Sequence, residues 1–332
     1  MKHKKIIEDM HRAMELSYDN SQRTYLGMSA QRTHCLRKTW LTFRHGFTPS
    51  THYQSISHFA DGHLSESITV SRLKGAGYEL IADDGTGKQF EFVDGWWKGH
   101  CDGFIYIDGE KCVWEHKCTN PQKMAKLKKL IADDEPTALE KWDQNYYAQS
   151  QSYLHYSGLK RHIMTVSCHG SREIKNSKVD QTTAILETAF NYDEYLVNKS
   201  EAKDIIATDR LPEAPYTLAI KRPLCWWGEE TYQHCEAYNF CTGKDIGEPD
   251  CFNCGHASFL ESGVGLCNNT GHEMLPSEMA EYKPCHKYSP EFVVGYDAIE
   301  MREDGSVLYR NNAGDEIVNE DSLEFRKKIR GE

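Results

Sequence analysis

Charged residues inside two short apolar strands constrain the fold of this chain most. Residues 99–118 read GHCDGFIYIDGEKCVWEHKC, and the Asp108-Gly109 pair in this stretch is a strong β-hairpin signal. Asp102, Glu115 and Lys117 stand in the two arms of the hairpin, where a buried charge is costly unless it is paired. The three residues therefore need a common partner or a common function.

The hairpin is expected to bring the three charges to one site. Side chains two residues apart on a strand share a face, so Glu115 and Lys117 face one side while the side chain of His116 points away. Pairing of the two arms places Asp102 near Glu115. Adjacent carboxylates repel unless a divalent cation lies between them, and oxygen ligands of this kind suit Mg²⁺ or Mn²⁺. Lys117 can then polarise an attacking water or stabilise charge on a phosphate.

Two pairs of helical residues accompany the hairpin. His63 and Glu66, at i and i+3, share one face of a helix expected before the strands, and His63 offers a nitrogen ligand. Gln149 and Tyr153, at i and i+4, share one face of a later helix. A lone histidine or carboxylate on such an element is most often structural or solvated. The ordered combination of all of them favours a catalytic site instead.

This ordered set resembles the PD-(D/E)XK nuclease superfamily, specifically its RecB-like branch. There a helix histidine is followed by GHxDG, then ExK, then QxxxY, and Cys101 stands here where the superfamily's name has a proline. The resemblance covers roughly residues 20–200. It implies an α/β fold with a restriction-endonuclease-like core, in which helices flank a central mixed sheet.

The resemblance also implies a role for each residue of the set. Lys117 would position or activate water, while Gln149 and Tyr153 would orient Lys117 and contact the DNA strand. Glu66 would be a supporting acid. The catalytic Mg²⁺ or Mn²⁺ would be held by His63, Asp102, Glu115 and the main-chain carbonyl of His116.

The periodicity along the chain predicts three parts. Residues 1–222 are expected to form the nuclease core with its N-terminal helices. Residues 223–290 form a Cys-, Gly- and His-rich region that would need metal to fold. Residues 291–332 are expected to form a β-hairpin and a charged tail. Within the core we expect helices over residues 1–18, 57–75, 121–132 and 138–156, and a buried strand over residues 161–170.

The sequence contains 12 cysteines and no recognisable secretory signal, which favours metal or iron-sulfur ligation over disulfides. Cys101, Cys112, Cys118 and Cys168 lie in the strand-rich part and are expected to be buried apolar thiols. The remaining eight cysteines divide into two groups of four.

The later group predicts a zinc site. It consists of Cys251, Cys254, Cys267 and Cys285, with the spacing C-x2-C-x12-C-x17-C. This spacing is typical of a zinc ribbon in which four thiolates close a structural site. Free thiols in a loop-rich segment are the alternative, and the nearby histidines rank below the cysteines as ligands: His256, His272 and His286.

The earlier group resembles the iron-sulfur clamp of RecB-like exonucleases, in which one cysteine before the core joins three after it. Cys35 would be the first, and Cys235 and Cys241 supply the C-x5-C of that pattern. The residue three before Cys235 is Tyr232, so Cys225 would have to replace the expected cysteine. A 4Fe-4S cluster, a zinc ion and an incomplete site all stay open.

The charge distribution allows a DNA-binding surface despite a net charge of −11. Residues 241–332 hold 9 Lys and Arg against 18 Asp and Glu, which leaves 30 against 32 for residues 1–240. The run MAKLKKL at residues 124–130 is a candidate for part of a basic groove, or equally a solvated helix face. No apolar stretch approaches the ~20 residues of a membrane helix, and the start of the chain has no signal-peptide pattern. We expect a cytoplasmic protein.

A closer resemblance, to RecB-like exonucleases encoded by bacteriophages, extends to about residue 290. It rests on YLGMSAQRTHCLRKTWLTFR near the start and on the cysteine-rich part that ends in KPCHKYSP. It implies a Mg²⁺- or Mn²⁺-dependent DNA exonuclease of phage recombination, replication or repair, beside a single-strand annealing protein, in the host cytoplasm. The alternatives are a structure-specific or CRISPR-adaptation-like trimming endonuclease of the same fold, and a DNA-binding or interaction module with a vestigial site.

Overall fold

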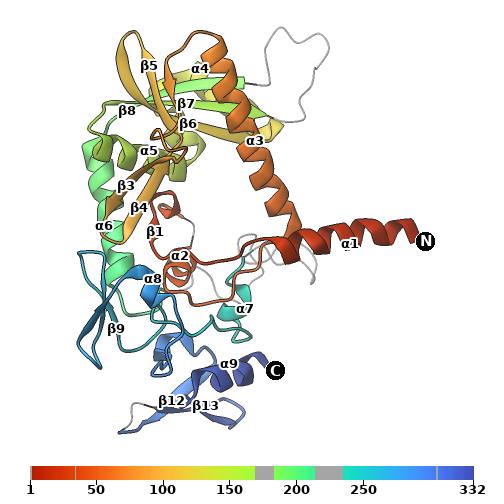
Figure 1. The fold of residues 1–332 in the computed structure, drawn as a ribbon, viewed down its shortest axis with the longest axis vertical. Helices are drawn as coiled ribbons and strands as arrows, with labels where there is room; N and C mark the ends of the chain where they lie inside the picture. The colour runs from red at the N-terminus through yellow and green to blue at the C-terminus, as the bar shows by residue number, and fades with distance from the viewer. Residues whose placement is uncertain (1, 34, 169–182, 214–234, 304–305) are drawn as a thin grey trace.

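The computed structural model describes residues 2–33, 35–168, 183–213, 235–303 and 306–332 (Figure 1). The main sheet and its helices lie at one end of the molecule, and the C-terminal strands lie at the other. Cys225 lies outside the described residues. No helix in the described part is long and apolar enough to span a bilayer.

The main sheet has five strands in the order β2-β5-β6-β7-β8. β6 and β7 pair in parallel and the other neighbours pair antiparallel, so the sheet is mixed as predicted. The predicted hairpin joins β5 to β6: Ile107 pairs with Glu110, and Asp108 and Gly109 both have positive φ, as a two-residue turn requires. The strands are β2 (Leu80–Ile81), β5 (Gly103–Ile107), β6 (Glu110–Thr119), β7 (Arg161–Cys168) and β8 (Thr183–Ala189).

A second, three-stranded sheet in the order β1-β4-β3 precedes the main one. Its strands are β1 (Leu26–Gly27), β3 (Phe90–Asp94) and β4 (Trp97–Cys101). The segment around Asp102, which the sequence presents as one strand, is therefore divided between two sheets. Gly103 permits this change, because a Cβ there would lie 2.4 Å from the carbonyl oxygen of Ile81. Asp102 stands alone at the switch between the sheets.

Helices cover both faces of the main sheet. α3 (Tyr53–Gly75) packs Val70 and Leu73 against the face that carries Trp114. α4 (Pro121–Trp142) packs Met124 and Leu127 against Met164 and Val166 on the opposite face. Glu115 and Lys117 alternate with Trp114, so they point to the α4 side. The remaining core helices are α1 (Lys2–Ser17), α2 (Leu36–Phe43), α5 (Gln144–Ser157) and α6 (Tyr192–Ala207).

The boundary between α4 and α5 differs from the prediction of helices over residues 121–132 and 138–156. α4 kinks at Asp134, where φ is −168°, and continues past Pro136 to Trp142. α5 begins after Asp143, whose carboxylate accepts hydrogen bonds from the main-chain N–H groups of Asn145 and Tyr146. This N-cap is a stronger helix start than the proline, because it pairs two otherwise free donors.

The C-terminal part is built from small elements, and the predicted hairpin after residue 306 is present as β13 and β14. β12 adds a third strand to it, and the charged end forms helix α9, which Asp321 caps. A separate antiparallel sheet has the order β11-β10-β9. The elements are α7 (Tyr238–Cys241), β9 (Ala257–Phe259), β10 (Gly265–Cys267), β11 (His272–Met274), α8 (Pro276–Met279), β12 (Tyr296–Met301), β13 (Val307–Asn311), β14 (Glu316–Val318) and α9 (Ser322–Arg330), with 3₁₀ turns at Met28–Ala30 and Pro290–Phe292.

Three of the four core cysteines are buried as predicted. Cys101, Cys112 and Cys168 are buried, whereas Cys118 at the end of β6 is half-buried. Burial raises the pKa of the Cys101 and Cys112 thiols, which keeps both protonated. They behave as small apolar side chains of the sheet.

His162 at the start of β7 is a buried neutral imidazole, and we expect it to make the fold acid-sensitive. Burial, together with the charge of Lys117, lowers the pKa of His162 to about 3. A depressed histidine pKa gives stability that is present above pH 6.5 and is lost as the pH falls. Between pH 7.5 and 5, the wild type should lose about 2 kcal/mol more unfolding free energy than His162→Gln. Urea denaturation at both pH values measures this, and equal losses in the two proteins would contradict it.

Candidate active site

Asp102, Glu115 and Lys117 meet in the structure. The Lys117 ammonium donates to Glu115 Oε1 at 2.6 Å. Asp102 Oδ2 accepts a hydrogen bond of 2.8 Å from the main-chain N–H of His116, the residue between the other two. Gly103 pairs with Trp114, so Asp102 stands beside Glu115 as the hairpin predicted. Both carboxylates are buried.

The two carboxylic acids of this cluster, Asp102 and Glu115, interact with a single positive charge, the ammonium of Lys117. Burial raises the pKa of Glu115 to about 8, and repulsion by Asp102 contributes to the rise. Burial likewise raises the pKa of Asp102. Burial opposes the charge on Lys117, but the carboxylates of Glu115 and Asp102 outweigh it and raise the lysine pKa. When both acids are ionised, the single lysine leaves one excess negative charge in the site.

Two predicted residues of α3, Glu66 and His63, interact electrostatically with this cluster. Burial and the charge of Asp102 raise the pKa of Glu66 to about 7. His63 is exposed, and its charge would lower the pKa of Asp102, so it lies within electrostatic range of that carboxylate. The structure thus brings both predicted α3 residues to the cluster.

The side chain of His116 points to the opposite face, as predicted. Its Nε2 lies 2.8 Å from Ser65 Oγ, and its Nδ1 lies 2.9 Å from Thr165 Oγ1. These contacts use the imidazole to join α3, β6 and β7. Only the main chain of His116 therefore faces the carboxylates.

Gln149 and Tyr153 form a buried chain of hydrogen bonds. Gln149 Nε2 donates to the Tyr153 hydroxyl at 2.8 Å, and that hydroxyl donates to the His100 carbonyl at 2.6 Å. The contact holds α5 against β4 directly before Asp102. A Cβ on Gly99 would lie 2.6 Å from Tyr153 Cε1, so this glycine permits the close approach.

The sequence interpretation missed two side chains of the cluster. Tyr146 lies under the ammonium of Lys117, 4.9 Å from nitrogen to ring centroid. It precedes Gln149 by three residues, so the helical period could have identified it. Gln89 Nε2 donates to Asp102 Oδ1 at 2.8 Å. Only the β3–β4 register, which pairs Phe90 with Cys101, reveals Gln89.

The donor atoms of the cluster are of the kind that binds a divalent cation. In the described part of the chain, no group of three or more His, Cys, Asp or Glu side chains is arranged to hold a metal ion. Glu115 Oε2, however, is buried and finds no hydrogen-bond partner among the described residues. Mg²⁺ uses one or two carboxylates and keeps several waters. The donor set therefore fits Mg²⁺ or Mn²⁺.

Three cysteines of the earlier group, Cys35, Cys235 and Cys241, interact with one another in the structure. Burial raises the pKa of the Cys241 thiol to about 11, and the nearby Cys235 and Cys35 thiols contribute to the rise. These three cysteines therefore lie close to one another, although Cys35 is at least 200 positions before the other two in the sequence. Cys225, the fourth of the predicted group, is not described.

The later cysteine group surrounds one small cavity of about 20 Å³ in the C-terminal part. Cys251, Cys254, Cys267 and Cys285 all line it. Of the three histidines considered as alternative ligands, His256 and His286 also line it.

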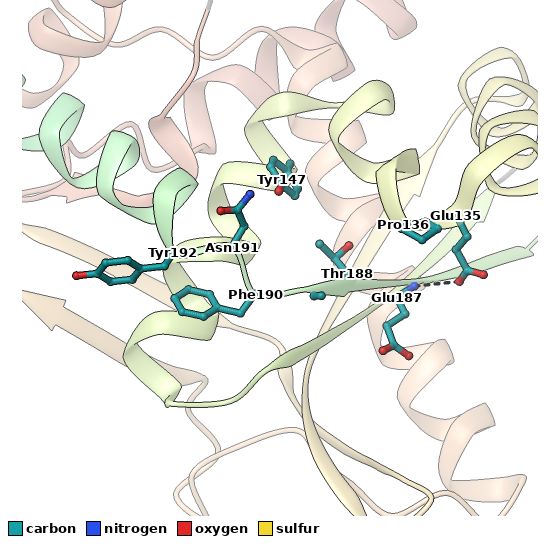
Figure 2. A pocket seen from close by; sticks show the side chains of 9 residues that line it. Glu135, Pro136, Tyr147, Glu187, Thr188, Phe190, Asn191 and Tyr192 are labelled. Atoms are coloured by element: carbon teal, nitrogen blue, oxygen red, sulfur yellow. Dashed lines mark hydrogen bonds between the residues drawn. The ribbon is translucent and has the colours of Figure 1, made fainter.

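A separate open hollow of about 630 Å³ lies where β8 ends and α6 begins (Figure 2). Tyr147, Phe190 and Tyr192 line one part of it. Glu135 and Glu187 line the other, where Glu135 Oε1 accepts a hydrogen bond from the main-chain N–H of Glu187. It contains none of the predicted catalytic residues, and its carboxylates would repel phosphate.

Compared with known proteins, the chain matches no protein-family model and no curated protein. Among solved structures it aligns with an alkaline exonuclease from Laribacter hongkongensis at 13% identity and a TM-score of 0.39, over 60% of this chain and 91% of that one. A phage-related exonuclease from Haemophilus somnus 129PT aligns at 13% identity and a TM-score of 0.31, over 43% of this chain and 66% of that one. Because these TM-scores are low, we base the function on the chemistry of the site.

Proposed function

We propose that this protein is a metal-dependent DNA exonuclease that hydrolyses phosphodiester bonds. The observation that carries the proposal is the meeting of two buried carboxylates and one lysine, Asp102, Glu115 and Lys117, at the switch between two sheets. This arrangement agrees with the motif order that resembles the PD-(D/E)XK superfamily. The chemistry of the set suits attack of water on a phosphodiester.

Asp102 and Glu115 would hold the Mg²⁺ or Mn²⁺, with the carbonyl of His116 and with His63 at the open side. When bound, the ion would stabilise negative charge on the phosphate and lower the pKa of bound water. The raised pKa of Glu115 supports this assignment, because a cation would relieve the repulsion by Asp102 that causes part of the shift.

Lys117 would act on the water or on the phosphate. Its ammonium is fixed between Glu115 Oε1 and the ring of Tyr146, so its position is set before DNA binds. Its raised pKa keeps it protonated at neutral pH. We therefore assign Lys117 to orienting the attacking water and to stabilising the charge that develops on the phosphate. Glu66, with a pKa of about 7, is the group best placed to accept a proton.

A cationic and aromatic patch beside the cluster would contact the DNA backbone. Lys98 Nζ and the Arg23 guanidinium lie 5.7 and 5.8 Å from the centre of the Tyr25 ring. The His100 ring lies 6.3 Å from the Tyr25 ring. Lys98 and His100 share one face of β4, which leads directly to Asp102. Cations and a ring in this arrangement suit a phosphate and a stacked base.

The resemblance to phage exonucleases supports a role in DNA recombination, replication or repair. A single-strand annealing protein is the partner that we propose for this role.

We also propose a metal clamp at Cys35, Cys235 and Cys241 with Cys225 as the fourth ligand. Thiolates of this number suit either an iron-sulfur cluster or zinc.

The choice between exonuclease and endonuclease is tested with end-labelled linear DNA and covalently closed circular DNA of the same sequence. With Mg²⁺ or Mn²⁺ we expect linear DNA to be degraded at least about 100-fold faster than the closed circle, because an exonuclease needs an end. EDTA should abolish both reactions. Equal loss of both substrates would establish the endonuclease alternative, and absence of any metal-dependent cleavage would establish a non-catalytic module.

A further inference from the structure

The four cysteines around the small C-terminal cavity come from three separate stretches of chain. Cys251 and Cys254 lie in the loop before β9, Cys267 ends β10, and Cys285 lies after α8. The main-chain N–H of Gly255 donates to the Lys287 carbonyl at 2.8 Å, which joins the first stretch to the third. A cavity of about 20 Å³ is about the volume of one small ion or water.

Two of the three histidines near the cavity, His272 and His286, are less suited to metal binding than the cysteines. His286 Nε2 lies 2.8 Å from Asn253 Oδ1, and its Nδ1 lies 2.8 Å from Ser322 Oγ. Both ring nitrogens are therefore already engaged. His272 is an exposed residue of β11 and does not line the cavity. Four thiolates would suffice for a tetrahedral zinc site without any histidine, although the described residues do not hold these sulfurs in ligand geometry without the ion.

We propose that Cys251, Cys254, Cys267 and Cys285 bind one structural Zn²⁺, and that this site secures the strand that leads to Asp102. Binding would release the thiol protons and draw the four sulfurs onto the ion. The surrounding elements need such support, because β9, β10 and β11 have three residues each and bury few apolar side chains.

The loop that carries the first two cysteines is inserted into the core. Asp250 Oδ2 lies 2.5 Å from His45 Nδ1, and both side chains are buried. The Phe252 ring stacks on the His45 ring with 4.1 Å between centroids. Asn253 Nδ2 donates to the His45 carbonyl at 2.9 Å. Three residues beside or between the two cysteines thus hold the turn after α2.

The segment after Cys254 contacts the turn between β3 and β4. Trp96 Nε1 donates to the Leu260 carbonyl at 2.8 Å, and the Phe259 ring lies 5.1 Å from the Trp96 ring. A Cβ on Gly95 would lie 2.4 Å from the Glu261 carbonyl oxygen, so the two backbones are in close contact. Trp96 directly precedes β4, which ends one residue before Asp102. This packing connects the zinc site to the catalytic strand.

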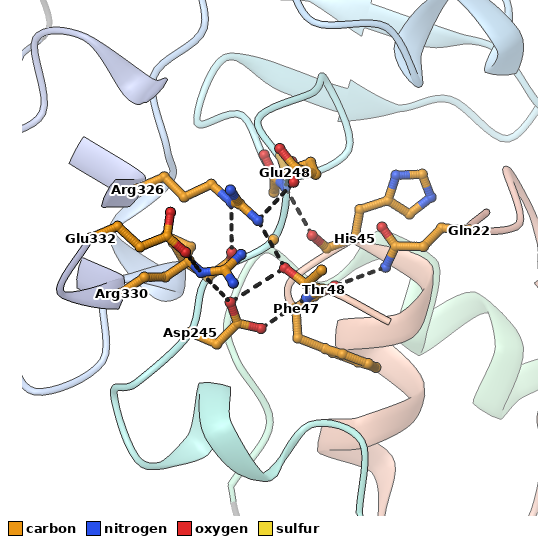
Figure 3. A network of polar contacts seen from close by, with 12 residues as sticks. Gln22, His45, Phe47, Thr48, Asp245, Glu248, Arg326, Arg330 and Glu332 are labelled. Atoms are coloured by element: carbon orange, nitrogen blue, oxygen red, sulfur yellow. Dashed lines mark hydrogen bonds and ion pairs between the residues drawn. The ribbon is translucent and has the colours of Figure 1, made fainter. Parts of the chain in front are cut away.

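The C-terminal helix secures the same region from the other side (Figure 3). Arg326 of α9 pairs with Glu248 at 2.7 Å, and Arg330 lies 3.8 Å from Asp245. Asp245 Oδ2 also accepts a hydrogen bond of 3.0 Å from the main-chain N–H of Thr48. These partly exposed pairs are weak individually. The inserted loop and the metal must therefore supply most of the anchoring.

The site is tested by metal analysis of the full chain purified without added chelator. We expect one zinc per chain from this site in the wild type, with a second only where the clamp at Cys35 holds zinc instead of iron. The matched control Cys112→Ala, which removes a buried thiol from the main sheet, should hold the same amount as the wild type. Cys254→Ser and Cys267→Ser should lose that zinc, and Cys267→His should retain it, because imidazole can replace a thiolate. Co²⁺ added to metal-free protein should give the intense visible absorption of a tetrahedral thiolate site. Wild type without zinc, or Cys254→Ser with a full zinc, would overturn the proposal.

The structural role of the zinc is tested separately, by thermal unfolding. Removal of zinc should lower the melting temperature by at least about 10 °C, and stoichiometric Zn²⁺ should restore it. An unchanged melting temperature would refute the structural role even if zinc binds. Both readouts are independent of cleavage, so a zinc-binding protein without nuclease activity would leave this inference standing and overturn the proposed function alone. The same metal analysis counts iron, which reports on the clamp at Cys35.

Discussion

Glu115→Gln should reduce metal-dependent cleavage of linear DNA by at least about 10³-fold while leaving the fold intact. The amide keeps the shape of the side chain and can still accept from Lys117, but it removes a negative ligand from the metal site. In metal-free protein at pH 9 the substitution should not lower the melting temperature, because it also removes the repulsion between Glu115 and Asp102. Single-turnover cleavage and thermal unfolding measure the two effects.

The matched control for this variant is Glu110→Gln. Glu110 is the first residue of β6, and its partner Arg161 also pairs with Glu187, so the change should leave cleavage within about twofold. A Glu115→Gln protein that cleaves at the wild-type rate would refute the metal-binding role. A variant with low activity and a much lower melting temperature would point to a structural role instead.

Lys117→Met should lower the cleavage rate by about 10²–10⁴-fold without weakening Mn²⁺ binding. The lysine competes with a metal for the charge of Glu115, so its loss leaves the carboxylates free for the ion. Calorimetry of Mn²⁺ binding and single-turnover cleavage separate the two roles. Lys111→Met, six residues earlier on β6, is the matched control and should retain cleavage.

Lys117→Arg distinguishes positioning of water from simple charge balance. Arginine keeps the positive charge beside Glu115 but replaces a compact ammonium with a planar fork. We expect its melting temperature to stay near that of the wild type, whereas its cleavage rate should be no more than a few per cent of the wild-type rate. Full activity in Lys117→Arg would show that only the charge is needed.

The sequence predicted the meeting of the two carboxylates and the lysine because the geometry of this cluster is local. Asp102, Glu115 and Lys117 belong to one hairpin, and the turn and the two-residue period of a strand fix their relative positions. The helical periods placed Gln149 and Tyr153 on one face in the same way. Each of these relations spans few residues, so it can be derived without knowing the rest of the fold.

Relations between distant segments could not be derived in this way. Gln89 joins Asp102 through the register of β3 on β4, and the chain leaves one sheet for another at Gly103 because of contact with Ile81. The break between α4 and α5 depends on the Asp143 cap rather than on Pro136. In each case the deciding contact or hydrogen bond competed with a local signal of similar strength.

Residue type and short spacing indicate which acids, which lysine and which cysteines are candidates for chemistry, because they set ligand chemistry and the face of an element. The contacts of those residues follow from the tertiary structure. It placed Tyr146 under Lys117, left Glu115 Oε2 without a partner among the described residues, and packed the segment after Cys254 against Trp96. Such contacts depend on how whole layers pack, and packing is set by the summed burial of many side chains that no local pattern specifies.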